Sequence, residues 1–263
     1  MKTEVKFGDI WKLGNHQLLC GDSSEEAMVN ALLKTKKPVL MVTDPPYGVN
    51  YTNSKTRRFR NDKNIIDNNE ISLSDIKIRN DHRSNWGKAI SLSRSRIAYV
   101  WGPSTNIDVT TQSLRDANYK VRQSIVWAKN RFALTSHGYH WKHEVCFYSV
   151  KEGQTSTWTG DRKQTSLWEE SVINPSERIH PTQKPIGLYL RPINNHTEKG
   201  DYVYDPFAGS GVLFVACEET GRKALGVELD PEYCSRIINR YQEQTGKKAK
   251  LVKNIFEEAQ ASA

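Results

Sequence analysis

The stretch Asp44-Pro45-Pro46-Tyr47 directly follows the apolar run "PVLMVT" and combines an acid, two prolines and an aromatic ring. Proline fixes its own φ, lacks an N–H and pushes the preceding residue towards extended geometry, so this loop is stiff and pre-set. The Asp44 carboxylate and the Pro45 carbonyl are acceptors beside the flat face of Tyr47. Two such acceptors suit a planar group that bears an NH2. A proline-rich turn with a capping Asp is the alternative if the tetrapeptide stands alone.

A second candidate site is the glycine-rich stretch "YDPFAGSGVLF", residues 204 to 214, between an expected strand and an expected helix. Glycines at the carboxyl end of a strand let the backbone approach a ligand closely. Glu228 ends the next expected strand, "GVELD", where a carboxylate can accept hydrogen bonds from both hydroxyls of a ribose; a solvated strand-end acid is the alternative. The pattern favours a nucleoside-type cofactor. Because "GSGVLF" lacks a third glycine, it argues against NAD.

The hydrophobic pattern predicts the elements that position these loops. Expected strands cover residues 16–20, 38–43, 96–101, 121–129, 143–150, 201–206 and 223–230, and expected helices cover 27–34, 104–118, 186–196, 211–221 and 231–244. Strands that alternate with helices predict an α/β fold with a doubly wound, mostly parallel sheet and helices on both faces. Ser23 and Glu26 have the spacing of a capping box before the first of these helices.

Composition limits the possible partners and compartment. The 263 residues suit one large domain, and the net charge of +8 favours a polyanionic partner, with simple solubility as the alternative. The four cysteines are far apart and form no C-x-x-C, so we expect no metal site and no disulfide framework. The sequence has no secretion signal and no run long enough to cross a membrane, so we expect a cytoplasmic protein without a membrane partner.

In their order along the chain, the motifs "LLCGDS", "DPPY", "HPTQKP" and "DPFAGSG" resemble those of the β class of amino-methylating DNA methyltransferases. The segments "GDIWKLGNHQLLCGDS", "YHWKHEVCFY", "WTGDRKQTSLW" and "GRKALGVELDPEYC" are similar to a phage and prophage-type group of DNA modification methylases. The resemblance implies one methyltransferase domain over residues 1–263 with a seven-stranded type of sheet. Loop insertions for DNA recognition would lie at about 50–96, a polar basic segment, and at about 130–178.

The same resemblance implies S-adenosylmethionine as the cofactor and assigns roles to matching residues. Asp44, Pro45, Pro46 and Tyr47 would form the catalytic loop. Glu228 would bind the cofactor's ribose and Asp22 would lie near its adenine. The remaining cofactor residues would be Thr182 and Lys184 at the methionine end, and Asp205, Phe207, Gly209 and Gly211 around the glycine loop.

The resemblance also implies double-stranded DNA as the substrate, with the target base flipped out of the helix. Within the class, Asp at the first loop position goes mostly with adenine and Ser mostly with cytosine, so Asp44 favours the N6 amine of adenine. The alternatives are an N4-cytosine methyltransferase, a catalytically dead DNA-binding relative, or methylation of RNA or a protein amide. The class is bacterial or phage-encoded and often dimeric, so a homodimer is an additional expectation.

Basic and aromatic residues outside the two loops are candidates for DNA contact. A solvated face is the alternative for each of these charged runs. The candidates are Arg57, Arg58, Arg60, His140, Lys142, Arg162 and Lys163.

Overall fold

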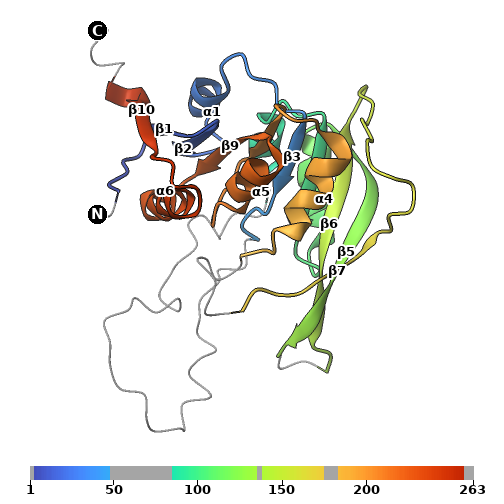
Figure 1. Ribbon diagram of the computed structural model, residues 1–263. Helices are drawn as coiled ribbons and strands as arrows, with labels where there is room; N and C mark the ends of the chain where they lie inside the picture. Colours follow the sequence, from blue (N-terminus) through green and yellow to red (C-terminus); the bar gives the residue numbers. More distant parts are fainter. Residues whose placement is uncertain (1–2, 48–84, 135–137, 175–182, 258–263) are drawn as a thin grey trace, which may run out of the picture.

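A single mixed sheet organises the protein. The computed structural model describes residues 3–47, 85–134, 138–174 and 183–257, and their ten strands lie in the order β10-β1-β2-β9-β8-β3-β4-β6-β5-β7 (Figure 1). The strands are β1 (Asp9–Leu13), β2 (His16–Cys20), β3 (Leu40–Thr43), β4 (Ile97–Gly102), β5 (Tyr119–Ala133), β6 (Trp141–Lys151), β7 (Leu167–Glu170), β8 (Tyr202–Asp205), β9 (Lys223–Glu228) and β10 (Lys250–Asn254).

The middle of the sheet is parallel. Strands β2, β9, β8, β3 and β4 are parallel to one another, β6 is antiparallel to β4, and β5 is antiparallel to β6. These seven strands are the seven that the hydrophobic pattern predicts, so the predicted α/β sheet is confirmed. Three further strands lie towards the edges. β1 and β10 form antiparallel pairs, and β7 is parallel to β5.

Helices cover both faces of the sheet, as expected for a doubly wound fold. They are α1 (Glu26–Leu33), α2 (Gly87–Ser91), α3 (Ile107–Asp116), α4 (Gly187–His196), α5 (Val212–Thr220) and α6 (Pro231–Thr245). Buried side chains of α4, α5 and α6 belong to one core cluster, and those of α1, α2 and α3 belong to a second. Helices α4, α5 and α6 stand in front of the sheet in Figure 1. Each face therefore has its own hydrophobic layer.

Strand β4 shows why an uninterrupted apolar run becomes a central strand. All six of its residues are buried, and successive side chains alternate between the two layers. Tyr99 and Trp101 pack in the cluster under α4, whereas Ala98 and Val100 pack in the cluster under α3. Both faces of β4 are thus packed in hydrophobic clusters, and β4 pairs with β3, the strand that leads to Asp44.

Two local predictions are wrong. The expected capping box does not form, because α1 begins at Glu26 after Glu25, which makes no side-chain capping bond. Asp22 instead accepts hydrogen bonds from the backbone N–H and the hydroxyl of Ser24, at 2.8 and 2.6 Å, and so forms a separate turn ahead of the helix. The segment expected as a loop to residue 96 contains α2, preceded by the buried Trp86.

Other expectations concern cysteines, metals and membranes. Cys20, Cys146, Cys217 and Cys234 are all buried free thiols. In the described ranges, no group of three or more His, Cys, Asp or Glu side chains could hold a metal ion. No helix in those ranges has the length and apolar character needed to cross a bilayer.

Candidate functional site

The carboxyl ends of four neighbouring parallel strands bring the predicted acids to one edge of the sheet. Asp22 follows β2, Glu228 ends β9, Asp205 ends β8 and Asp44 follows β3, and these strands are adjacent in that order. Because parallel strands end at the same edge, residues separated by up to 206 positions in sequence share one site.

The glycine loop is tied directly to Glu228. The backbone N–H of Gly209 donates to Glu228 Oε2 at 2.8 Å, and the Asp230 N–H donates to Oε1 at 2.9 Å. The Leu229 backbone also bonds to this carboxylate, which leaves acceptor capacity for one hydroxyl. Burial raises the pKa of Glu228 to about 7. Gly209 and Gly211 have φ of 51° and 73°, a left-handed conformation that favours glycine.

Asp205 accepts hydrogen bonds from β3 and from the glycine loop. Its Oδ1 accepts hydrogen bonds from the Thr43 hydroxyl at 2.6 Å and from the Phe207 N–H at 3.0 Å, which joins β8, β3 and the glycine loop. The side chain is 1% exposed, and its Oδ2 has no partner among the described residues. Burial raises the pKa of Asp205 to about 7. An unpartnered buried oxygen at this edge is consistent with a ligand group that completes the site.

Asp44 is held by two groups at once. The Tyr47 hydroxyl donates to its Oδ1 at 2.7 Å, and Lys184 Nζ lies 2.5 Å from its Oδ2. Burial raises the pKa of Asp44, and the Lys184 ammonium partly offsets this. Lys184 therefore contacts the proline loop, whereas the resemblance places it at the methionine end of the cofactor.

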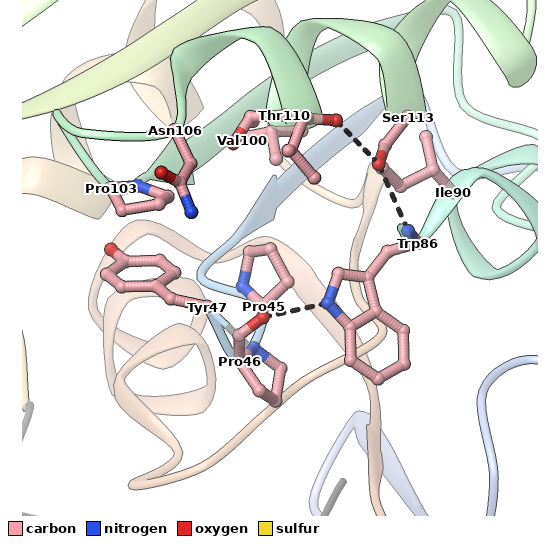
Figure 2. Close-up of a pocket in the computed structure, with 11 residues that line it drawn as sticks. Pro45, Pro46, Tyr47, Trp86, Ile90, Val100, Pro103, Asn106, Thr110 and Ser113 are labelled. Carbon is pink, nitrogen blue, oxygen red and sulfur yellow. Dashed lines mark hydrogen bonds between the residues drawn. The ribbon is translucent and has the colours of Figure 1, made fainter. Parts of the chain in front are cut away.

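The two proline carbonyls have different environments. The indole N–H of Trp86 donates to the Pro46 carbonyl at 2.8 Å (Figure 2), whereas no described residue donates to the Pro45 carbonyl. Trp86 also packs edge-to-face on Phe207 of the glycine loop, with ring centroids 4.8 Å apart. It thus links the two candidate loops. Sequence reasoning missed it, because a single aromatic in the polar stretch "NDHRSNWGK" gives no periodic signal.

The cavity in Figure 2 lies between the proline loop and helices α2 and α3. It is lined by Pro45, Pro46, Tyr47, Trp86, Ile90, Val100, Pro103, Asn106, Val109, Thr110 and Ser113. Its volume is about 10 Å³, which leaves room for roughly one water molecule and excludes a purine ring.

Replacing Trp86 by Phe should lower the melting temperature. The Pro46 carbonyl would lose its donor, at a cost of about 1–3 kcal/mol, which corresponds to roughly 2–4 °C per kcal/mol in a domain of this size. The control is Trp158→Phe, because Trp158 is 41% exposed and donates to the Asp161 carbonyl near the surface. Thermal unfolding of both variants checks the difference. Equal melting temperatures would mean that the Trp86 bond contributes nothing.

A chain of alternating charges leads from β5 to the proline loop. Lys129 Nζ lies 2.5 Å from Glu144 Oε1, and Lys184 Nζ lies 3.0 Å from Glu144 Oε2. Burial alone would raise the pKa of Glu144, but Lys184 and Lys129 lower it to about 2. Lys184 also lies over the Trp101 ring, 5.1 Å from its centroid. Glu144 and Lys129 had no role in the sequence prediction, although an acid that begins the buried run "EVCFYSV" is a signal.

The β5–β6 hairpin extends the sheet beyond the edge where β3 ends (Figure 1). His140 and Lys142 are exposed near its tip, and His140 stacks on Phe132 with ring centroids 5.0 Å apart. Side chains alternate along a strand, so Lys142 lies on the same face of β6 as Glu144. The structure therefore brings Lys142 to the side of the sheet that holds Asp44.

Two of the other predicted DNA contacts, Arg162 and Lys163, lie near the end of α4 that is opposite to Lys184 and Asp44. Arg162 and Lys163 are exposed and adjoin Gln164, whose amide pairs reciprocally with Asn195 near the end of α4. Lys184, which contacts Asp44, lies before the opposite end of that helix. Arg57, Arg58, Arg60 and Thr182 lie outside the described residues.

The fold and the site define a class: a doubly wound α/β protein with a glycine loop, a strand-end acid and a rigid acid-proline-proline-tyrosine loop at one sheet edge. The sequence also matches the model of the DNA methylase family, which comprises N6 and N4 methylases, over residues 39–240. The chain belongs to this DNA methylase family, and its motif order is that of the β class.

Curated relatives and solved structures agree with this assignment. The type II methyltransferase M2.MboI of Moraxella bovis is 26% identical over 238 residues, covering 83% of this chain and 84% of the relative. M2.LlaDCHI of Lactococcus lactis subsp. cremoris is 26% identical over 88% of this chain and 93% of the relative. The M1.HpyAVI-SAM complex has a TM-score of 0.61 at 20% identity, covering 85% of this chain and 98% of that chain. The cytosine-N4-specific PvuII DNA methyltransferase has a TM-score of 0.60 at 14% identity, covering 92% and 98%.

Proposed function

We propose that the protein transfers a methyl group from S-adenosylmethionine to the exocyclic N6 amine of adenine in double-stranded DNA. The observation that carries the proposal is the pair of acceptors at the end of β3. The Asp44 carboxylate and the Pro45 carbonyl, to which no described residue donates, adjoin the ring of Tyr47, in a loop that Trp86 fixes through Pro46. The curated relatives are type II methyltransferases, which supports DNA as the substrate.

The residues around the glycine loop fit the proposed cofactor. Glu228 is partly buried and keeps acceptor capacity for a ribose hydroxyl beside its backbone hydrogen bonds, and the Oδ2 of Asp205 has no partner among the described residues. A Cβ added to Gly209 would meet only the Phe207 carbonyl, at 3.8 Å, so the space above the loop is open to a ligand. Asp22, in its turn beyond β2, is next to Glu228 because the Gly21 N–H donates to the Glu228 carbonyl at 2.9 Å.

S-adenosylmethionine, when bound, supplies an electrophilic methyl group on a sulfonium sulfur. The adenine amine is a poor nucleophile, because its lone pair is delocalised into the ring. Hydrogen bonds from the amine to Asp44 and to the Pro45 carbonyl would favour a pyramidal nitrogen with an available lone pair. The Asp44 carboxylate would also stabilise the positive charge that develops on the amine and could accept the proton it loses. Orientation and electrostatics thus provide most of the catalysis.

The amine is inaccessible inside a duplex, so the proposal includes base flipping. Unstacking costs a few kcal/mol, and stacking on Tyr47 would offset on the order of 1–3 kcal/mol. The exposed His140 and Lys142 on the β5–β6 hairpin are proposed DNA contacts near the flipped base. Arg162 and Lys163 are proposed to contact DNA farther from Asp44, and Arg57, Arg58 and Arg60 are proposed DNA contacts as well.

Adenine is favoured over cytosine by the first residue of the loop. A carboxylate is a stronger acceptor than a hydroxyl and better offsets the charge that develops on the amine. N4-cytosine is the second candidate, because the same two acceptors could receive its amine and because the PvuII DNA methyltransferase shares this fold. The fold therefore does not decide between the bases, and the proposal depends on Asp44.

A long-read methylation profile of DNA from cells that express the protein tests the proposal. We expect N6-methyladenine at one short sequence motif, and the same cells expressing Asp44→Ala should lack it. N4-methylcytosine at the motif would mean that the methylated base is cytosine and not adenine. A profile identical to that of the Asp44→Ala cells would contradict methyl transfer to DNA.

A further inference from the structure

Lys184 is a buried cation with two carboxylate partners. Its side chain is 4% exposed, and its ammonium lies 2.5 Å from Asp44 Oδ2 and 3.0 Å from Glu144 Oε2. Burying an ammonium costs several kcal/mol unless charged partners satisfy it. Glu144 itself is balanced on its other oxygen by Lys129, so Lys184 is held between β6 and the proline loop rather than directed at open space.

The proposed reaction requires an ionised Asp44 that presents a free lone pair to the target amine. Burial opposes ionisation, and Lys184 is the one cation that contacts Asp44 among the described residues. Its position also gives the two oxygens of the Asp44 carboxylate different partners. Oδ2 is occupied by the ammonium, whereas Oδ1 accepts only the Tyr47 hydroxyl, at 2.7 Å.

We propose that Lys184, anchored by Glu144, is a positioning residue for Asp44 and not a residue that binds the cofactor. It fixes the carboxylate through Oδ2, so that Oδ1 receives the target amine. This inference rests on the proposed methyl transfer through Asp44. It replaces the role that the resemblance of "HPTQKP" implies for Lys184.

The pH dependence of the reaction gives a readout that a purely structural role would not change. Lys184 lowers the pKa of Asp44, whereas Glu144 raises it. If methyl transfer requires ionised Asp44, the rate falls as the pH drops through the pKa of this group. The titratable groups whose charges act on Asp44 or are acted on by it are Tyr47 on its own loop, Lys184 and Tyr189 at α4, Glu144 and Cys146 on β6, and Asp205 on β8.

The two neighbours of Asp44 should therefore shift the pH profile in opposite directions. Lys184→Met removes the cation and should move the acidic limb of the single-turnover rate to higher pH. Glu144→Gln keeps a hydrogen-bond acceptor for Lys184 but removes the negative charge, and should move that limb to lower pH. Lys184→Arg keeps a cation and should leave the limb closer to that of the wild type than Lys184→Met does.

The experiment measures single-turnover transfer of a tritiated methyl group to plasmid DNA from a methylase-deficient bacterial host. At neutral pH the rate of Lys184→Met should fall by about 10²-fold, because a misplaced acceptor loses its orientation. Its dissociation constant for S-adenosylmethionine, measured by calorimetry, should change by no more than about threefold. Lys12→Met, an exposed lysine on β1, is the matched control and should leave both quantities unchanged.

A Lys184→Met protein that binds cofactor more than about tenfold more weakly, with an unshifted acidic limb, would overturn the inference and restore the cofactor role. If Lys184→Met does not fold, the profiles of Glu144→Gln and Lys184→Arg decide, and an upward shift for Glu144→Gln would also overturn it. If the wild-type protein transfers no methyl group to any DNA, the proposed function fails instead.

Discussion

Replacing Asp44 by Ala should reduce methyl transfer by about 10³-fold or more while leaving the dissociation constant for S-adenosylmethionine within about tenfold. The carboxylate accepts from the Tyr47 hydroxyl and from Lys184, and the glycine loop and Glu228 make no hydrogen bond to it. Its loss therefore removes the acceptor for the target amine and spares the cofactor pocket. Methyl transfer is measured as the label that DNA retained on a filter has gained from labelled S-adenosylmethionine. The dissociation constant is measured by isothermal calorimetry.

Two further variants make this result specific. Asp44→Asn keeps the side-chain volume but removes the charge, so it should also be inactive. Asp108→Ala removes an exposed carboxylate from the first turn of α3 and should retain the wild-type rate. Retained turnover by Asp44→Ala would eliminate Asp44 as the group that receives the amine.

Substitution of the two loop glycines should have a different effect at each position. Both have positive φ, so valine is strained in either place by about 1–2 kcal/mol. A Cβ at Gly209 would meet only the Phe207 carbonyl oxygen among the described residues, at an ordinary contact distance of 3.8 Å, whereas a Cβ at Gly211 would lie 2.9 Å from Ile237 Cγ2 of α6. Gly209→Val should therefore weaken cofactor binding by about tenfold or more, because its side chain occupies the ligand's approach.

Gly211→Val is the matched comparison. Its side chain must displace Ile237, so overpacking adds about 1–3 kcal/mol to the strain and the melting temperature should fall further than in Gly209→Val. Calorimetric titration and thermal unfolding of both variants check this. An unchanged cofactor affinity in Gly209→Val would place the cofactor away from this loop.

The sheet and the meeting point of the acids could be predicted from the sequence because both follow from local patterns. Short apolar runs rich in β-branched and aromatic residues, such as "LMVT" of β3 and "IAYVWG" of β4, favour central strands, and neighbouring parallel strands end at the same edge. Asp44, Asp205 and Glu228 were therefore expected to lie together. Strands β1 and β10, at one end of the sheet, were missed, because they are short and carry charged or exposed residues that weaken the strand pattern.

The contacts of the site depend on strand order, which the hydrophobic pattern does not encode. Glu144 reaches Lys184 because β6 is inserted antiparallel between β4 and β5, and Trp86 reaches Pro46 across 40 residues of sequence. The capping box failed for a local reason. Ser24 donates to Asp22 in a turn ahead of the helix, and the residue before α1, Glu25, makes no side-chain capping bond.

The most direct test of the account is the identity of the nucleoside that the purified protein methylates. Plasmid DNA from a methylase-deficient host would be incubated with the protein and S-adenosylmethionine carrying a deuterated methyl group, digested to nucleosides and resolved by mass spectrometry. We predict deuterated N6-methyladenine, which should be absent from the reaction with Asp44→Ala. Deuterated N4-methylcytosine without N6-methyladenine would contradict the account.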